Sequence, residues 1–281
     1  MRSRRRKRFK QQKERKGIYI LPNLFTSASL FGGFYAIIAA TQGRYEAAAV
    51  AIIISAIFDG LDGRIARFTQ TTSHFGTEFD SLSDVIAFGV APGILVFEWA
   101  MKPFGRFGWL AAFMYVICGA LRLARFNVQK SGQDVSFFKG LPIPSAACLI
   151  SSLVLVADDL GGFPKNTPFL IVLISYMLSF LMVSAIAYPS FKKFNIKNQK
   201  PFNVLVSVIL ICIVIAYKPS IILFLMMSLY ILSGPAVTLQ RLFARRSTLI
   251  RAGHEFPAVP PNETDKGATI DQEGTEPLDA K

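Results

Sequence analysis

Long segments without a single charged residue recur along this chain. Asp, Glu, Lys and Arg are absent from residues 18–43, 141–157, 166–191, 201–217 and 219–240. A hydrocarbon core about 30 Å thick is crossed by about 20 helical residues, and these segments are of that order. The pattern therefore predicts membrane-spanning helices.

Apolar runs between clusters of charge extend this prediction to eight helices. They cover residues 18–41, 46–68, 76–99, 107–127, 141–157, 167–188, 202–217 and 219–240. We expect an all-α fold, a polytopic membrane bundle of about eight transmembrane helices. Composition agrees, because only 17% of the 281 residues are charged, against roughly 25% in soluble domains, and this excludes a single water-soluble globule.

The distribution of charge predicts the orientation. The net charge is +13, and most Lys and Arg residues fall on the side of the predicted bundle that carries the N-terminus. By the positive-inside rule, both termini are expected in the cytoplasm. We accordingly expect an integral protein of the cell (inner) membrane, with its active site facing the cytoplasm.

The two ends of the chain differ from the membrane domain predicted at residues 18–240. Residues 1–17 form a basic juxtamembrane segment, which we interpret as a topology signal that attracts anionic lipid and not as a nucleic-acid site. Residues 241–281 are predicted to be a cytoplasmic tail, mostly disordered, because from residue 252 they turn rich in Pro, Gly, Thr and acids.

Four aspartates carry the candidate chemistry. Asp59 and Asp62 are three residues apart, and Asp80 and Asp84 are four apart, so each pair projects from one face of its helix. The short connection at 68–75 lets the two faces meet. Converging carboxylates repel one another unless hard cations lie between them, so the pattern predicts an all-oxygen site for one or two Mg²⁺ or Mn²⁺ ions.

Neighbouring residues suit a phosphate group. Gly63 removes a side chain one turn after Asp59, where a ligand would approach the backbone, and Arg67 supplies a cation for a phosphate oxygen. Acids, divalent ions and an arginine at a membrane interface indicate phosphoryl chemistry on a lipid.

This stretch resembles the CDP-alcohol phosphatidyltransferase family. Every fixed position of the family signature DxxDGxxARx8GxxxDxxxD is matched, by Asp59, Asp62, Gly63, Ala66, Arg67, Gly76, Asp80 and Asp84. Further segments are similar to the phosphatidylserine synthase branch: PNLFT (22–26), SLSDVIAFGVAP (81–92), ALRLARFN (120–127) and KGLPIPSA (139–146). The resemblance covers residues from about 18 to 240.

The resemblance implies transfer of the phosphatidyl group from CDP-diacylglycerol to L-serine, with release of CMP, in a helical bundle that is commonly a homodimer. It implies that the metal is bound by Asp59, Asp62, Asp80 and Asp84, with Asp84 also the general base. It further implies that the CDP-lipid is bound by Gly63, Arg67 and Ser73, together with Asn23 and Thr26.

The amino-acid acceptor needs a site for a zwitterion. Arg122 and Arg125, at the cytoplasmic end of the predicted helix 107–127, suit the serine carboxylate or a lipid phosphate, with Asn127 and Lys139 near them in sequence. An alternative interpretation is that these cations only obey the positive-inside rule.

Two other functions remain open from the sequence. The same chemistry could use another acceptor, such as glycerol 3-phosphate or an inositol phosphate. Intramembrane acids also mark ion pathways, so an ion-coupled membrane carrier is the second alternative. The acids cluster at one side of the predicted bundle, which favours an enzyme over a carrier.

Overall fold

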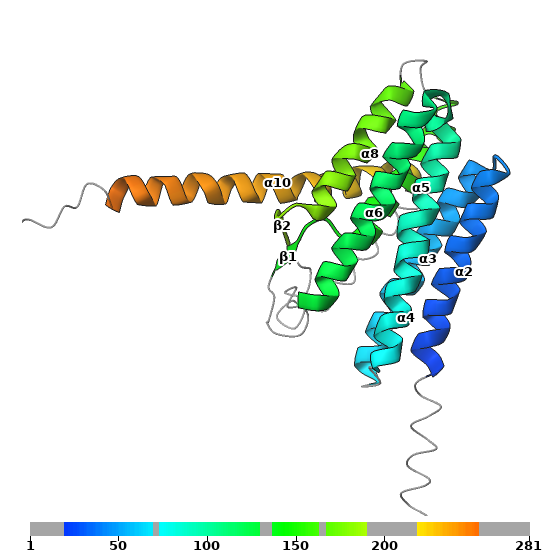
Figure 1. Ribbon diagram of the computed structural model, residues 1–281, viewed down its shortest axis with the longest axis horizontal. Coiled ribbons are helices and arrows are strands. Elements are labelled where there is room, and N and C mark those ends of the chain that lie inside the picture. The colour runs from blue at the N-terminus through cyan, green and yellow to red at the C-terminus, as the bar shows by residue number, and fades with distance from the viewer. Residues whose placement is uncertain (1–19, 70–72, 130–136, 163–166, 190–217, 253–281) are drawn as a thin grey trace, which may run out of the picture. The chain divides into compact units, whose positions relative to one another are not determined.

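The computed structural model describes residues 20–69, 73–129, 137–162, 167–189 and 218–252, most of which are helical (Figure 1). The chain divides into two compact units, residues 1–239 and residues 240–281. The predicted helix 202–217 lies outside the described residues.

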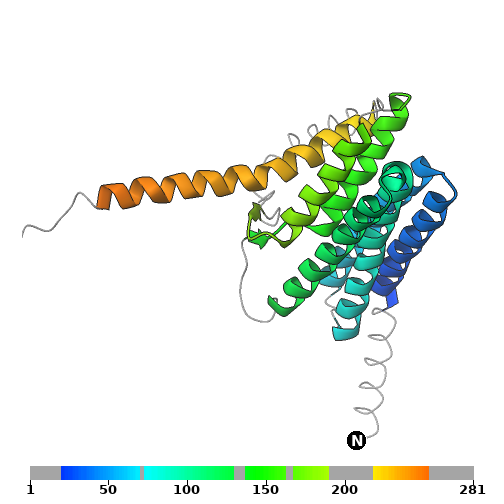
Figure 2. The ribbon, with the colours of Figure 1, turned by 45° about the horizontal axis from the view of Figure 1, so that its top comes forward.

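The described helices follow the predicted order, as the two ribbon views show (Figures 1 and 2). They are α2 (Ile20–Thr41), α3 (Tyr45–Phe68), α4 (His74–Asp84), α5 (Ala91–Val96), α6 (Arg106–Gln129), α7 (Ile143–Asp159), α8 (Thr167–Val183) and α10 (Pro219–Ala252). From α4 to Phe104 the chain stays helical, and Gly105 forms the turn before α6. The π-helical stretch η1 (Val85–Val90) joins α4 to α5, and a second π-helical stretch, η2 (Phe97–Met101), and a 3₁₀ turn, η3 (Lys102–Phe104), extend the run beyond α5.

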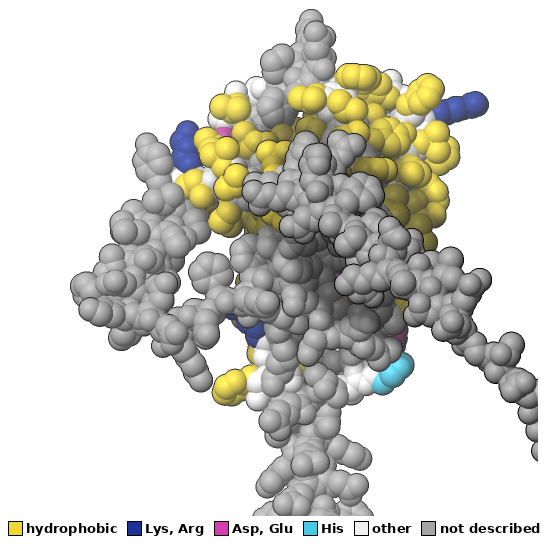
Figure 3. Space-filling view, turned by 90° about the vertical axis from the view of Figure 1, so that its left-hand side faces the viewer, with side chains coloured by type: hydrophobic (Ala, Val, Ile, Leu, Met, Phe, Trp, Pro, Cys, Tyr) yellow, Lys and Arg dark blue, Asp and Glu magenta, His cyan; other side chains and the backbone are white. Residues whose placement is uncertain are grey.

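Within the part of the chain that the structure describes, four segments are long and apolar enough to cross a membrane: Leu21–Thr41, His74–Phe104, Arg106–Val128 and Pro219–Thr238. Their outer faces carry large exposed side chains such as Phe31, Phe34 and Phe113, and Figure 3 shows hydrophobic side chains over much of the described surface in that view. Such a surface is soluble in lipid and not in water. The prediction of a helical membrane protein is therefore confirmed.

One predicted helix is too long at its C-terminal end. We expected helix over 167–188, but α8 ends at Val183, and residues Ala187–Pro189 form strand β2, which pairs antiparallel with β1 (Phe137–Lys139). The backbone N–H groups of Gly140 and Leu141 donate to the carbonyls of Ile186 and Leu181. Hydrogen bonds from another segment thus replace those that would continue the helix. A three-residue strand is too short to leave a periodic pattern in the sequence.

Small residues bring the first helices close together. A Cβ added at Gly32 of α2 would lie 2.3 Å from Ser55 Oγ of α3, and one at Gly33 would lie 2.6 Å from the Cα of Ala87 in η1. Alanines line the same contact, with Ala36, Ala39, Ala40, Ala48, Ala49, Ala87 and Ala91 all buried. In a membrane, where apolar side chains gain little from leaving lipid, close backbone contact is a main source of helix association.

A proline explains one contact between α6 and the long helical run. Pro92 has no N–H group, so it cannot donate to the carbonyl of Phe88 four residues earlier. The hydroxyl of Tyr115, a fully buried residue of α6, donates to that carbonyl at 3.1 Å. This bond helps to fix α6 beside η1, the segment that directly follows Asp84.

Candidate functional site

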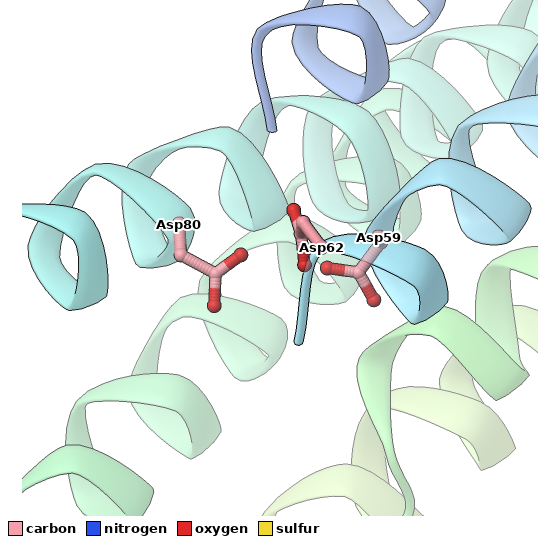
Figure 4. Close-up of side chains that lie close together, drawn as sticks. All are labelled: Asp59, Asp62 and Asp80. Atoms are coloured by element: carbon pink, nitrogen blue, oxygen red, sulfur yellow. The ribbon is translucent and has the colours of Figure 1, made fainter. Parts of the chain in front are cut away.

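Three carboxylates from two helices meet at one end of α3. Asp59 and Asp62 come from the last part of α3, and Asp80 comes from α4. Each offers an oxygen that lies within 4.8 Å of an oxygen of the other two. Figure 4 shows the carboxyl group of Asp80 directed across the gap toward the two acids of α3. The predicted meeting of the two helix faces thus occurs in the structure for these three residues.

Asp84 joins this group through Asp59. The side chains of these two residues are hydrogen-bonded to each other. Two carboxyl groups can approach to hydrogen-bonding distance when a proton or a cation lies between them. Asp84 is the last residue of α4 and is followed by the π-helical η1, and π-helical turns in α-helices often occur at functional sites.

Hydrogen bonds tie Asp62 to α2. Thr26 Oγ1 lies 2.8 Å from Asp62 Oδ2 and donates to it, although the two residues are 36 positions apart. Ser83 of α4 donates from its hydroxyl to the backbone carbonyl of Thr26 at 3.2 Å. Thr26, Asp62 and Ser83 are all buried. This one threonine therefore connects three helices beside the carboxylates.

The start of α4 is built around Ser73. Its side chain accepts a hydrogen bond from the backbone N–H of Gly76 at 3.0 Å and caps the helix. A Cβ added at Gly76 would lie 3.1 Å from Ser73 Oγ and 3.3 Å from Asn23 Oδ1. Asn23, Ser73 and Gly76 thus meet between α2 and α4. At Gly63 an added Cβ would meet nothing within 4 Å, so the space beside this residue is open.

Arg122 is a buried cation within electrostatic range of Asp84. Arg122 is only 8% exposed, and its Nε has no hydrogen-bond partner among the described residues. Its charge interacts with the Asp84 carboxyl group and with Tyr230 of α10, and its guanidinium lies 5.8 Å from the centre of the Phe126 ring. A buried arginine with an unused donor is suited to binding an anion.

The other predicted acceptor residues have different surroundings. Arg125 donates to the backbone carbonyl of Val183, the last residue of α8, at 3.3 Å, which satisfies a carbonyl at a helix end. Asn127 Nδ2 donates to Ser81 Oγ at 2.8 Å and so links α6 to α4. The backbones of Arg67 and Lys139 belong to α3 and β1, but their side chains lie outside the described part of the structure.

The donor set suits a hard cation. The cluster consists of carboxylates alone, and their oxygens are close enough for one ion to contact several of them. Mg²⁺ and Mn²⁺ prefer such oxygen ligands. Gly63, the neighbour of Asp62 in the sequence, has open space beside it, and the cation of Arg122 interacts electrostatically with Asp84. The arrangement can therefore hold a metal ion together with an anionic group such as a phosphate.

Sequence reasoning missed two residues of this site. Ser83 was not singled out, although it stands three residues after Asp80 as a polar residue entering an apolar run, which is a usable signal. Tyr230 lies in the charge-free first part of α10, residues 219–240, with no nearby motif, so no pattern in the sequence connected it with Arg122.

Comparisons with known proteins agree with these observations. The family model described as CDP-alcohol phosphatidyltransferase matches residues 19–191. A CDP-diacylglycerol–serine O-phosphatidyltransferase of Helicobacter pylori is 42% identical over 217 residues, which make up 77% of this chain and 90% of that protein. A protein of the same name from Bacillus subtilis is 35% identical over 179 residues, 63% of this chain and 94% of that protein. An archaetidylserine synthase of Methanothermobacter thermautotrophicus is 40% identical over 171 residues, 60% of this chain and 69% of that protein.

Proposed function

This chain belongs to the CDP-alcohol phosphatidyltransferase family, and from this premise we propose that it transfers the phosphatidyl group of CDP-diacylglycerol to L-serine, giving phosphatidylserine and CMP. The observation that carries the proposal is the group of carboxylates which α3 and α4 bring together in a helical membrane domain. Serine as the acceptor is supported by the relatives, since serine stands in each of their names.

The reaction is a substitution at the phosphorus that carries diacylglycerol. A bond forms between the serine hydroxyl oxygen and this phosphorus, the bond from phosphorus to the oxygen of CMP breaks, and CMP leaves with the electron pair. Asp84 takes the proton of the serine hydroxyl as the general base. The proposal is supported by the position of Asp84, whose carboxyl group is next to that of Asp59 and interacts electrostatically with Arg122, the proposed serine-binding cation.

Asp59, Asp62, Asp80 and Asp84 would hold one or two Mg²⁺ or Mn²⁺ ions. When bound, such an ion neutralises the diphosphate and stabilises the departing nucleotide. Gly63, with open space beside it, and Arg67 are proposed to bind the diphosphate of the CDP-lipid, with Asn23 and Ser73 next to it.

The serine carboxylate is proposed to bind Arg122. The buried guanidinium, its Nε without a partner among the described residues and its interaction with Asp84 support this assignment. An anion held there would lie close to the proposed base, and the serine hydroxyl would then point toward the phosphorus. Arg125, Asn127 and Lys139 are proposed to line the same acceptor pocket, where Arg125 and Asn127 also hold α8 and α4 in place.

The chain is proposed to have eight transmembrane helices with both termini in the cytoplasm. This makes residues 18–240 the membrane domain, residues 1–17 a basic segment at the lipid surface, and residues 241–281 a tail. The tail was expected to be mostly disordered, but its first part is helical, because α10 continues to Ala252. The excess of Lys and Arg on the side of the N-terminus supports this orientation. The same proposal places the enzyme in the cell membrane as a homodimer with its active site toward the cytoplasm, where CDP-diacylglycerol from the lipid and serine from the water can meet.

The test is CMP release by the purified protein in detergent. CDP-diacylglycerol is supplied with serine, glycerol 3-phosphate, inositol or an inositol phosphate, each with and without Mg²⁺ or Mn²⁺. Metal-dependent release of CMP with serine is the expected result. Release with another alcohol alone would keep the family chemistry and overturn the acceptor assignment. Absence of release with every acceptor, together with substrate flux in sealed vesicles, would support a carrier.

A further inference from the structure

Thr26 makes the closest described polar contact to the carboxylates from outside α3 and α4. Its hydroxyl donates to Asp62 Oδ2 at 2.8 Å and also lies 3.2 Å from the carbonyl of Pro22, one turn earlier in α2. Because a hydroxyl group has a single proton, the shorter contact to a carboxylate is the stronger hydrogen bond.

The threonine is held from its other side as well. Ser83 donates to the backbone carbonyl of Thr26, and Ser83 directly precedes Asp84 in α4. Thr26 is 4% exposed and Ser83 is 2% exposed, so both hydrogen bonds are shielded from water. Buried hydrogen bonds of this kind keep their geometry, since breaking one leaves an unsatisfied polar group.

The carboxylate of Asp62 needs such support. A carboxylate accepts hydrogen bonds at about four lone-pair sites, and that of Asp62 receives the Thr26 hydroxyl and the backbone N–H of Gly63. Two bonds restrict the orientation of the carboxylate and leave further lone pairs available, and one of its oxygens lies within 4.8 Å of oxygens of Asp59 and Asp80. Without the hydroxyl, Asp62 could rotate about its side-chain bonds away from the other acids.

We propose that Thr26 is a positioning residue for the metal site, which holds Asp62 in the orientation that a divalent cation requires. This role differs from the contact with the CDP-lipid that the family resemblance implies for Thr26. The inference rests on the proposed function in one respect, namely that these acids bind Mg²⁺ or Mn²⁺. Groups that orient metal ligands typically change metal affinity by about 10- to 100-fold when they are removed.

The test is direct binding of Mn²⁺ to the full-length protein in detergent without substrate, measured by electron paramagnetic resonance. Thr26→Val removes the hydroxyl but keeps the branched shape, and we expect it to weaken Mn²⁺ binding about tenfold. Thr26→Ser keeps the hydroxyl and is expected to bind Mn²⁺ like the wild type. Ser27→Ala is the matched control, because Ser27 is exposed and donates only to the carbonyl of Asn23.

A second measurement separates positioning from lipid binding. The Mn²⁺ concentration that gives half-maximal CMP release should rise in Thr26→Val, whereas the KM for CDP-diacylglycerol at saturating Mn²⁺ should stay the same. Wild-type Mn²⁺ affinity in Thr26→Val, or a raised KM for the lipid alone, would overturn the inference. If Thr26→Val does not fold, the Mn²⁺ affinity of Thr26→Ala, which lacks the hydroxyl, is compared with that of Thr26→Ser, which keeps it. A wild-type protein that turns over without binding Mn²⁺ or Mg²⁺ would refute the metal site itself.

Discussion

The contact between α2 and α3 has two halves built on different principles. In one half, which contains Ala36, Ala40 and Ala48, small apolar side chains let the backbones approach. In the other half, Thr26 and Asp62 meet through a buried hydrogen bond. The side chains of the first half carry no reactive groups, but their small size sets the distance between the helices. The second half depends on that spacing, because the Thr26 hydroxyl of α2 reaches Asp62 Oδ2 of α3 at 2.8 Å only if the two helices are close.

The carboxylates that the polar half supports, Asp84 of α4 among them, should be the most sensitive to the change of a single atom. Asp84→Asn keeps the size of the side chain but removes the proposed base, and we expect CMP release to fall by at least about 10²-fold. The variant should still fold and bind CDP-diacylglycerol, which chromatography and a lipid-binding assay would check. Asp158→Asn, a change at an exposed acid in α7, is the matched control. Substantial residual activity of Asp84→Asn would sink the assignment of the base.

The close packing of α2 continues from α3 to η1, and its dependence on side-chain volume can be tested at Gly33, which faces Ala87 of η1. Gly33→Ala places a methyl group 2.6 Å from the Cα of Ala87, where backbone must move. We expect a loss of about 1–3 kcal/mol in the free energy of unfolding, measured as a lower melting temperature in detergent. Gly60→Ala is the control, because its added Cβ would meet nothing within 4 Å. Equal melting temperatures for the two variants would contradict the idea that close packing at Gly33 sets the helix spacing.

Whether a feature of this contact could be predicted from the sequence depends on how far apart along the chain its residues lie. Helix α3 was predicted at 46–68 and is found at Tyr45–Phe68, because a long apolar run with local periodicity fixes a membrane helix. The approach of Asp80 to Asp59 could also be predicted, because a short connection joins the two helices that carry them. The bond between Thr26 and Asp62 could not be predicted, since it joins residues 36 positions apart and depends on helix packing. The strands β1 and β2 and the contact of Arg125 with Val183 are non-local in the same way.

Replacing Arg122, a cation on α6, tests whether a residue outside α2, α3 and α4 also takes part in the site. Arg122→Lys keeps the buried charge but loses the planar guanidinium, so it should hold a carboxylate less well. We expect the KM for serine to rise about tenfold, the effect of losing about 1.4 kcal/mol of binding free energy, with the KM for CDP-diacylglycerol little changed. The reverse pattern, a higher KM for the lipid alone, would assign Arg122 to the lipid phosphate. An unchanged KM for both substrates would leave Arg122 without a role in binding.

The smallest effect is expected at the far end of the same helical run. Lys102 forms an ion pair with Glu98, one turn away, and its side chain is 59% exposed. Lys102 lies 22 residues after Asp80, about 33 Å along a helix at 1.5 Å per residue. Charges so far apart are screened by salt within about 10 Å, and an exposed pair of this kind contributes little to stability. We therefore expect Lys102→Ala to bind Mn²⁺ and release CMP within about twofold of the wild type. A tenfold loss of Mn²⁺ affinity at an unchanged melting temperature would mean that the two ends of the run are coupled, and that the polar half does not act alone.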